Sequence, residues 1–288
     1  MRSFAKVFCL SLLSVALLAG SAQARTVKGC VIKATASCAG KNLSGQNLRG
    51  VNLSYADLRG VNFSKADLRG AILKGAELRR ANLKGAKLGP QPNVQTKRAD
   101  LSYADLSYAD LSKADLYGAN LTSATLSYAT LTSATLSYAT LPAATLNYAS
   151  MDGAQLNNAK LAAASLEHVI LSHANLSYSD LYNANLYDAD LSAATLIYAQ
   201  FAMANLYTAD LFGADLTNAI LTAADLTHAD LYGANLTSAT LNFATLNYAL
   251  VDHANLTGAS LIAADLTNAE SCSLVIPSGY LNGRGCSS

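Results

Sequence analysis

Cysteine has the most informative placement of the reactive residue types in this chain of 288 residues. Cys30 and Cys38 precede a long repeat array, and Cys272 and Cys286 follow it. The spacings C-x7-C and C-x13-C are not those of zinc sites, and all four His lie elsewhere. An even number of cysteines in an exported chain indicates disulfides. Because the ends of a long array are far apart, we expect the pairs Cys30–Cys38 and Cys272–Cys286.

The N-terminal segment, residues 1–24, predicts export. Arg2 and Lys6 form a charged n-region, residues 7–20 are mostly apolar, and Ala22-Gln23-Ala24 is an A-x-A cleavage motif. Cleavage after Ala24 removes Cys9, so four cysteines remain in the mature chain. It leaves no other long apolar run, so we expect a soluble mature protein without a transmembrane segment. The expected location is the periplasm or the extracellular space, and the alternative is an uncleaved membrane anchor.

The other titratable residues predict no active site. The four histidines, His168, His173, His228 and His253, all stand two residues after a Leu or Val and point outward. No nucleophile–base pair, glycine-rich phosphate loop or helix-borne metal motif occurs, so we expect no enzyme, no metal and no cofactor. Many Asp residues directly precede a Leu, where Asp and Asn bond readily to nearby backbone. The alternative for these carboxylates is a cation-binding ladder. Examples are Asp100, Asp105, Asp110 and Asp115.

A five-residue repeat must position all of these side chains. From Ala99 to Asn268 the chain reads Ala-(Asp/Asn/Thr)-Leu-x-x in 34 units, with Leu at 31 of the central positions and Ala two residues earlier in 32. A period of five fits neither a helix nor a strand. A short fixed period predicts a solenoid, in which no unit buries its apolar face alone. We expect Leu and Ala to point inward and the other three residues outward.

The chain divides into segments around a break in this repeat. A first block, residues 41–88, contains ten units, and residues 89–98 hold two prolines that predict a loop. The spacing from Leu88 to the next central residue, Leu101, is not a multiple of five, so the loop either bulges from one rod or hinges two. Residues 99–268 form the main block. We expect an N-terminal cap at 25–40 and a C-terminal disulfide cap at 269–288.

The two halves carry opposite charge. Residues 25–98 hold 15 Lys and Arg against 3 Asp and Glu, a net charge of +12, whereas residues 99–288 hold 3 against 16, a net charge of −13. A basic surface attracts polyanions, which for an exported protein are anionic lipid, lipopolysaccharide or acidic polysaccharide. The alternatives are a merely solvated surface and weak self-association of basic and acidic ends. The candidate polyanion-binding residues are Arg49, Arg59, Arg69, Lys74, Arg79, Arg80 and Lys84.

Tyrosine is the abundant aromatic residue, with 15 Tyr and no Trp. Tyr108, Tyr128 and Tyr148 recur every four units, so we expect them to stack on one face. Such a column either stiffens the coil or offers an aromatic strip for binding sugar or protein.

The pattern, as in Ala104-Asp105-Leu106-Ser107-Tyr108, resembles that of the pentapeptide-repeat proteins over residues 41–268, in 44 units. The resemblance implies an all-β fold, a right-handed quadrilateral β-helix of about 11 coils in two register blocks. It also implies a non-catalytic binding or scaffold protein, whose partner is an unknown protein or an anionic envelope polymer. Some members mimic DNA and bind DNA gyrase. That alternative is disfavoured here by the leader and the basic block, and we expect no nucleic-acid partner. Lumenal members in phototrophs make the thylakoid lumen an alternative location.

Overall fold

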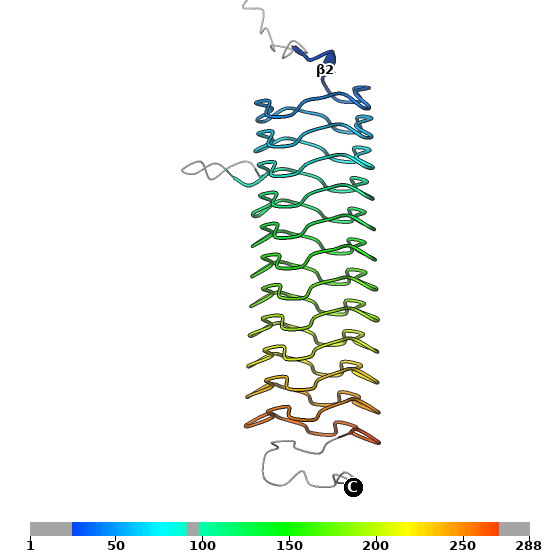
Figure 1. Ribbon diagram of the computed structural model, residues 1–288, viewed down its shortest axis with the longest axis vertical. Helices are drawn as coiled ribbons and strands as arrows, with labels where there is room; N and C mark the ends of the chain where they lie inside the picture. Colours follow the sequence, from blue (N-terminus) through cyan, green and yellow to red (C-terminus); the bar gives the residue numbers. More distant parts are fainter. Residues whose placement is uncertain (1–24, 91–97, 271–288) are drawn as a thin grey trace, which may run out of the picture.

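The protein is a rod of stacked coils (Figure 1), each built from four units that form its four sides. The computed structural model describes residues 25–90 and 98–270. The rod begins with an antiparallel hairpin of β1 (Arg25–Val27) and β2 (Cys30–Ile32). The rest of the described chain forms isolated parallel bridges, mostly between residues four units apart, such as Asp100 with Asn120. Four five-residue units therefore make one coil, and each coil pairs only with the coils above and below it.

Each unit turns one corner of the square. The Leu N–H donates to the next coil, as Leu101 N does to the carbonyl of Asn120 at 2.7 Å, and Ala104 N closes the turn onto the carbonyl of Leu101 at 3.0 Å. The second residue after the Leu adopts a left-handed conformation, with φ of 59° at Tyr103. Such a φ costs a non-glycine residue about 1–2 kcal/mol, so the ladder and core must offset a repeated local strain.

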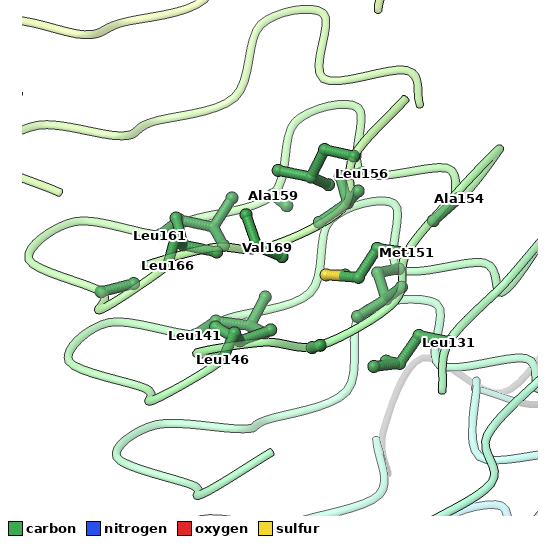
Figure 2. Packing of buried hydrophobic residues seen from close by; sticks show 14 of the residues in the cluster. Leu131, Leu141, Leu146, Met151, Ala154, Leu156, Ala159, Leu161, Leu166 and Val169 are labelled. Carbon is green, nitrogen blue, oxygen red and sulfur yellow. The ribbon is translucent and has the colours of Figure 1, made fainter. Parts of the chain in front are cut away.

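Leu and Ala fill the inside of the rod, as the repeat predicts (Figure 2). The central residues from Leu43 to Leu261 are almost completely buried, including the replacements Met151 and Val251. Phe63 and Phe201 take the place of Leu at two other centres and are also fully buried. A fully buried Leu contributes on the order of 1.5–3 kcal/mol before entropy is subtracted. The apolar core is therefore continuous along the whole axis.

The ladder continues across the break in the repeat. Ile72 bridges Asp100 and Lys87 bridges Asp115, whereas within each block a residue bridges the one that stands four units later. The two blocks thus share one ladder. The described residues therefore form one continuous rod across the break and not two hinged rods. Residues 91–97 lie outside the described part of the chain.

The N-terminal end of the rod carries a disulfide between Cys30 and Cys38, whose Cα atoms are 5.2 Å apart. Both cysteines are fully buried, and Cys30 is the first residue of β2, so the disulfide joins the hairpin to the first coil. The expected leader at 1–24 and the expected pair Cys272–Cys286 lie outside the described residues. Within residues 25–90 and 98–270, no helix has the length and apolar character needed to cross a membrane.

Candidate functional site: the corners of the rod

The outward side chains form columns along the four corners of the rod. We number the corners by the Leu that precedes them: corner 1 follows Leu101, corner 2 follows Leu106, corner 3 follows Leu111 and corner 4 follows Leu116. The bridges place residues of successive coils in register. Each corner therefore forms a column along the rod axis, to which every coil contributes the two residues that follow its central residue. In this register Arg49 and Arg69 lie on corner 4 and Arg59 and Arg79 on the opposite corner 2, as expected from the sequence.

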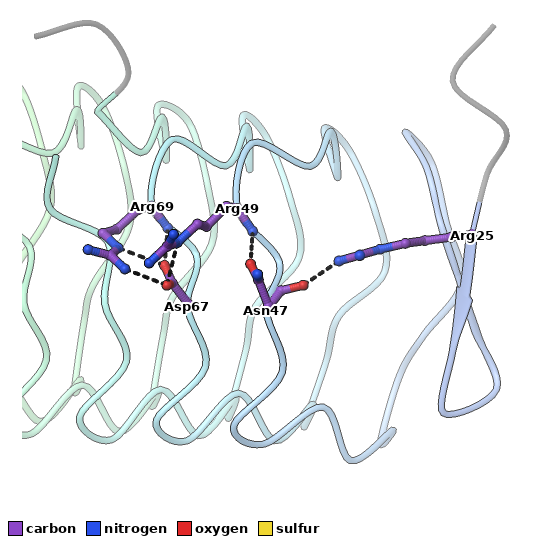
Figure 3. A network of polar contacts seen from close by, with 5 residues as sticks. All are labelled: Arg25, Asn47, Arg49, Asp67 and Arg69. Atoms are coloured by element: carbon purple, nitrogen blue, oxygen red, sulfur yellow. Dashed lines mark hydrogen bonds and ion pairs between the residues drawn. The ribbon is translucent and has the colours of Figure 1, made fainter. Parts of the chain in front are cut away.

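Two arginines of corner 4 share one carboxylate (Figure 3). Arg49 Nε and Arg69 Nη2 each lie 2.6 Å from Oδ2 of Asp67, whose side chain is only 18% exposed. The backbone N–H of Arg49 donates to Oδ1 of Asn47, and the carbonyl of Asn47 accepts a bond from Arg25. These arginines are therefore engaged within the rod and have little free charge to offer an external anion.

The arginines of corner 2 are also paired. Arg59 donates to both carboxylate oxygens of Asp57, at 2.8 and 2.7 Å, and lies 3.4 Å from Glu77. The hydrogen bond from Arg59 holds the pKa of Asp57 below its usual value, and the same contact raises the pKa of Arg59. Arg79 pairs with Asp105 at 3.2 Å, across the join between the two blocks.

Two other candidate cations lie over tyrosine rings. The Arg80 guanidinium is 6.0 Å from the ring centre of Tyr108, and the Lys74 ammonium is 5.8 Å from that of Tyr103. Exposed cation–π contacts of this kind are worth about 0.5–1 kcal/mol. Of the seven candidates, only the Lys84 side chain has no carboxylate or ring contact among the described residues.

Free positive charge gathers on corner 3. Every ion pair of the described residues is made by Arg or His, and none by Lys. Lys65, Lys84 and Lys113 are exposed and occupy three consecutive coils of this corner. Lys65 and Lys113 are not among the candidate residues predicted from the sequence. Lys113 stands beyond the register break, and only the bridges that cross the break bring it next to the first block.

The Asp and Asn residues before Leu cap the backbone turns. Oδ1 of Asp105 accepts the N–H of Ser107 at 3.0 Å, and the same bond recurs from Asn42 to Asp265. These contacts confirm the expected local role of Asp and Asn. The alternative, a cation-binding ladder, gains no support, because no group of three or more ligating side chains occurs in the described part of the rod.

Corner 2 carries the expected tyrosine column, extended further along the rod. Tyr108, Tyr128 and Tyr148 stack with ring centres 4.9 Å apart and planes within 3° of parallel. His168 stacks on Tyr148 at 4.6 Å. Because each ring covers part of its neighbour, the column presents mainly ring edges and hydroxyls, so sugar stacking on free ring faces is disfavoured. Successive ring contacts continue the column through Tyr187, Tyr207, His228 and Tyr248.

The histidines serve separate local contacts. His168 Nδ1 lies 2.8 Å from Asp188 on corner 2, and His173 Nδ1 lies 3.1 Å from Asp152 on corner 3. The structure therefore does not bring His168 and His173 together around a shared ligand.

Comparison with known proteins agrees with this architecture. The family described as pentapeptide repeats matches in 8 copies between residues 36 and 270, leaving out 90–98. HetL, a pentapeptide repeat protein involved in heterocyst differentiation regulation from the cyanobacterium Nostoc sp. strain PCC 7120, is 32% identical with a TM-score of 0.51. The match covers 82% of this chain and 94% of HetL.

Two further solved structures show weaker likeness. A pentapeptide repeat protein of the Arabidopsis thaliana thylakoid lumen is 29% identical over 44% of this chain and 68% of its own, with a TM-score of 0.30. QnrB1, a plasmid-mediated fluoroquinolone resistance protein, is 18% identical over 81% of this chain and 91% of its own, with a TM-score of 0.34. No curated protein matches significantly. The repeat, the square coils and the family match together establish that the chain belongs to the pentapeptide repeat family, whose members form right-handed quadrilateral β-helices.

Proposed function

We propose that this chain is a non-catalytic, exported binding rod that engages an anionic polymer or surface of the bacterial envelope through its first coils. The observation that carries this proposal is the lysine series on corner 3, defined by Lys65, Lys84 and Lys113. Coils stack about 4.8 Å apart, and two ammonium groups at that separation would repel by about 1 kcal/mol in water. A bound polyanion relieves this repulsion, whereas the paired arginines gain less from it.

A charge-matched comparison tests the proposal. The lysine variant combines Lys65→Gln, Lys84→Gln and Lys113→Gln, and the control variant changes Arg49, Arg59 and Arg69 to Gln. Both remove three positive charges, so a difference between them reports the place of binding and not the net charge. The probes are alginate, a linear acidic polysaccharide, and vesicles of phosphatidylglycerol in phosphatidylcholine.

We expect the lysine variant to bind the polyanion at least fivefold more weakly and the arginine variant to bind within about twofold of the parent protein. Binding should also weaken steeply as salt is added. Equal losses in the two variants, or no binding of either probe at low salt, would refute the corner 3 assignment.

Export rests on the leader-like sequence at 1–24, and the Cys30–Cys38 disulfide suits an oxidising compartment. The test is fractionation of cells expressing the full chain, with mass spectrometry of the recovered protein. A start at Arg25 and two disulfides supports export to the periplasm, the cell exterior or a thylakoid lumen. A full-length, reduced, cytosolic protein refutes it.

DNA mimicry directed at DNA gyrase is the second candidate function, and the net charge of −13 over residues 99–288 is the observation that favours it. Inhibition or protection of gyrase supercoiling by the purified rod, together with a cytosolic location, would establish it over envelope binding. A rod without effect on supercoiling would remove it.

A further inference from the structure

Corner 1 carries the fewest charged residues of the four corners. It comprises the two residues after each central residue from Leu53 to Leu261, and Lys74 is the single charged residue among its 22 members. Corners 2 and 3 each carry five charged residues in the described chain, and corner 4 carries two, Arg49 and Arg69, which both pair with Asp67. A stripe with one charged residue along the whole described rod is unusual for a surface that only has to remain solvated.

The largest side chains of corner 1 are exposed and lack ring partners. Phe243 is 63% exposed, Tyr103 61% and Met203 54%. No ring–ring contact of the described residues involves corner 1, whereas the rings of corner 2 stack on one another. Apolar surface of this kind gains free energy when another apolar surface covers it.

We propose that corner 1 is the contact surface of a lateral, antiparallel dimer of two copies of this rod. A two-fold axis at Ala163, the middle coil of the corner, brings residues of opposite ends together. Large side chains then face small ones in successive coils: Tyr103 faces Ala223, Met203 faces Ser123 and Tyr182 faces Pro142. Farther out, Phe243 reaches the ring of Tyr55, which lies over Gly75.

Charge selects the antiparallel arrangement. Residues 25–90 hold 13 Lys and Arg against 3 Asp and Glu, whereas residues 201–270 hold 7 Asp and Glu and no Lys or Arg. The antiparallel pair lays each basic end along the acidic end of the partner copy. A parallel pair instead places like charges side by side and sets Phe243 against Phe243, so both charge and shape oppose it.

The size of the contact predicts a weak dimer. From Tyr55 to Ala263 the corner spans ten steps between bridged coils, which amounts to about 48 Å. With a contact width of about 10 Å, the two copies bury about 1,000 Å² in total, near the lower limit for a specific interface. We therefore expect a salt-sensitive equilibrium of monomer and dimer and not an obligate assembly.

Ala163→Arg tests this interface, because it sets two positive charges against each other at the two-fold axis. The fold should tolerate the change, since Arg80 and Lys113 occupy equivalent positions with φ of 56° and 57°. Ala193→Arg on corner 3, with φ of 52° against 55° at Ala163, is the matched control. Melting curves of both variants should match the parent protein.

Sedimentation equilibrium of protein recovered from the full chain should show dimers in about 0.02 M salt that dissociate in about 0.5 M salt. Ala163→Arg should weaken the dimer at least tenfold, and Ala193→Arg should shift it less than twofold. A monomer in both salts, or equal behaviour of the two variants, overturns the proposal.

Cysteine cross-linking tests the orientation. A mixture of Ser123→Cys and Met203→Cys proteins should form a disulfide-linked heterodimer under mild oxidation, while each variant alone should not. Cross-linking of Ser123→Cys with itself indicates a parallel pair, and the absence of any link in a dimeric sample indicates another interface. Either result overturns the antiparallel assignment, and neither depends on whether the rod binds a polyanion.

Discussion

Ser179 is the most informative single position for testing the energetics of the core. It replaces the inward Ala of its unit, its side chain is fully buried, and its Oγ has no hydrogen-bond partner among the described residues. The equivalent residues of the adjacent coils are Ala159 and Ala199. The backbone bonds of Ser179, to Leu176 at 3.0 Å and from Gln200 at 2.9 Å, do not depend on the side chain.

Ser179→Ala should therefore stabilise the rod. A buried, unsatisfied hydroxyl costs about 1–3 kcal/mol, and the dispersion contacts of the one lost oxygen offset about 0.5 kcal/mol of that gain. A net gain of about 1–2 kcal/mol raises Tm by about 2–8 °C for a protein of this size. The reverse change one coil away, Ala159→Ser, buries a new hydroxyl and should lower Tm by a similar amount.

Thermal melts followed by circular dichroism measure both changes. Ser192→Ala is the control, because that hydroxyl is partly exposed and donates to Asp190 at 2.6 Å, so its loss should be neutral or slightly destabilising. If Ser179→Ala leaves Tm unchanged or lowers it, the hydroxyl has a partner in solution and the inference of an unsatisfied core group is wrong. Amide exchange across residues 176–205 then shows whether the effect is local.

Three further perturbations test other parts of the rod. Leu186→Asp places a carboxylate in a fully buried site and should abolish the cooperative melt, with a loss of at least about 4 kcal/mol; a parent-like melting curve would contradict the coil packing. Gly75→Ala must displace the ring of Tyr55, whose nearest atom would lie 2.5 Å from the new Cβ. It should therefore lower Tm by more than Gly60→Ala, where φ is 62° and no atom lies within 4 Å. Equal losses in the two variants would show that the Tyr55 ring moves freely. Asp57 has a depressed pKa in the folded rod, so its contact with Arg59 stabilises the fold above pH 3.8, and this stabilisation is lost as the pH falls below that value. The Tm of Arg59→Gln should therefore converge with the parent Tm in acid. A difference in Tm that does not depend on pH would refute the pairing.

The inside of the rod was predictable because the repeat leaves little choice. A central Leu and the Ala two residues before it recur with a period of five, and only a coil buries side chains spaced in this way. The inward positions could therefore be predicted directly from the repeat. The capping role of Asp and Asn also followed from their short side chains. The N-terminal hairpin did not follow, because residues 25–32 lie outside the repeat and have no period of their own.

The outer surface was only partly predictable. The four-unit register placed the arginines on the correct corners, but a count of charges does not show pairing. The sequence Asp57-Leu58-Arg59 could have predicted this pairing, because the residues on either side of an inward Leu point to the same outer surface. Lys113 escaped notice because the length of the insertion had to be known before the blocks could be aligned.

The stacked rings of corner 2 have an optical consequence. The chain contains 15 Tyr and no Trp, so tyrosine alone emits its fluorescence. With ring centres 4.9 Å apart and ring planes within 3° of parallel, excitation passes readily between neighbouring phenols. The fixed, asymmetric surroundings of these rings also give a near-ultraviolet dichroism signal that vanishes when the coils separate. The folded rod therefore reports its own integrity without an added label.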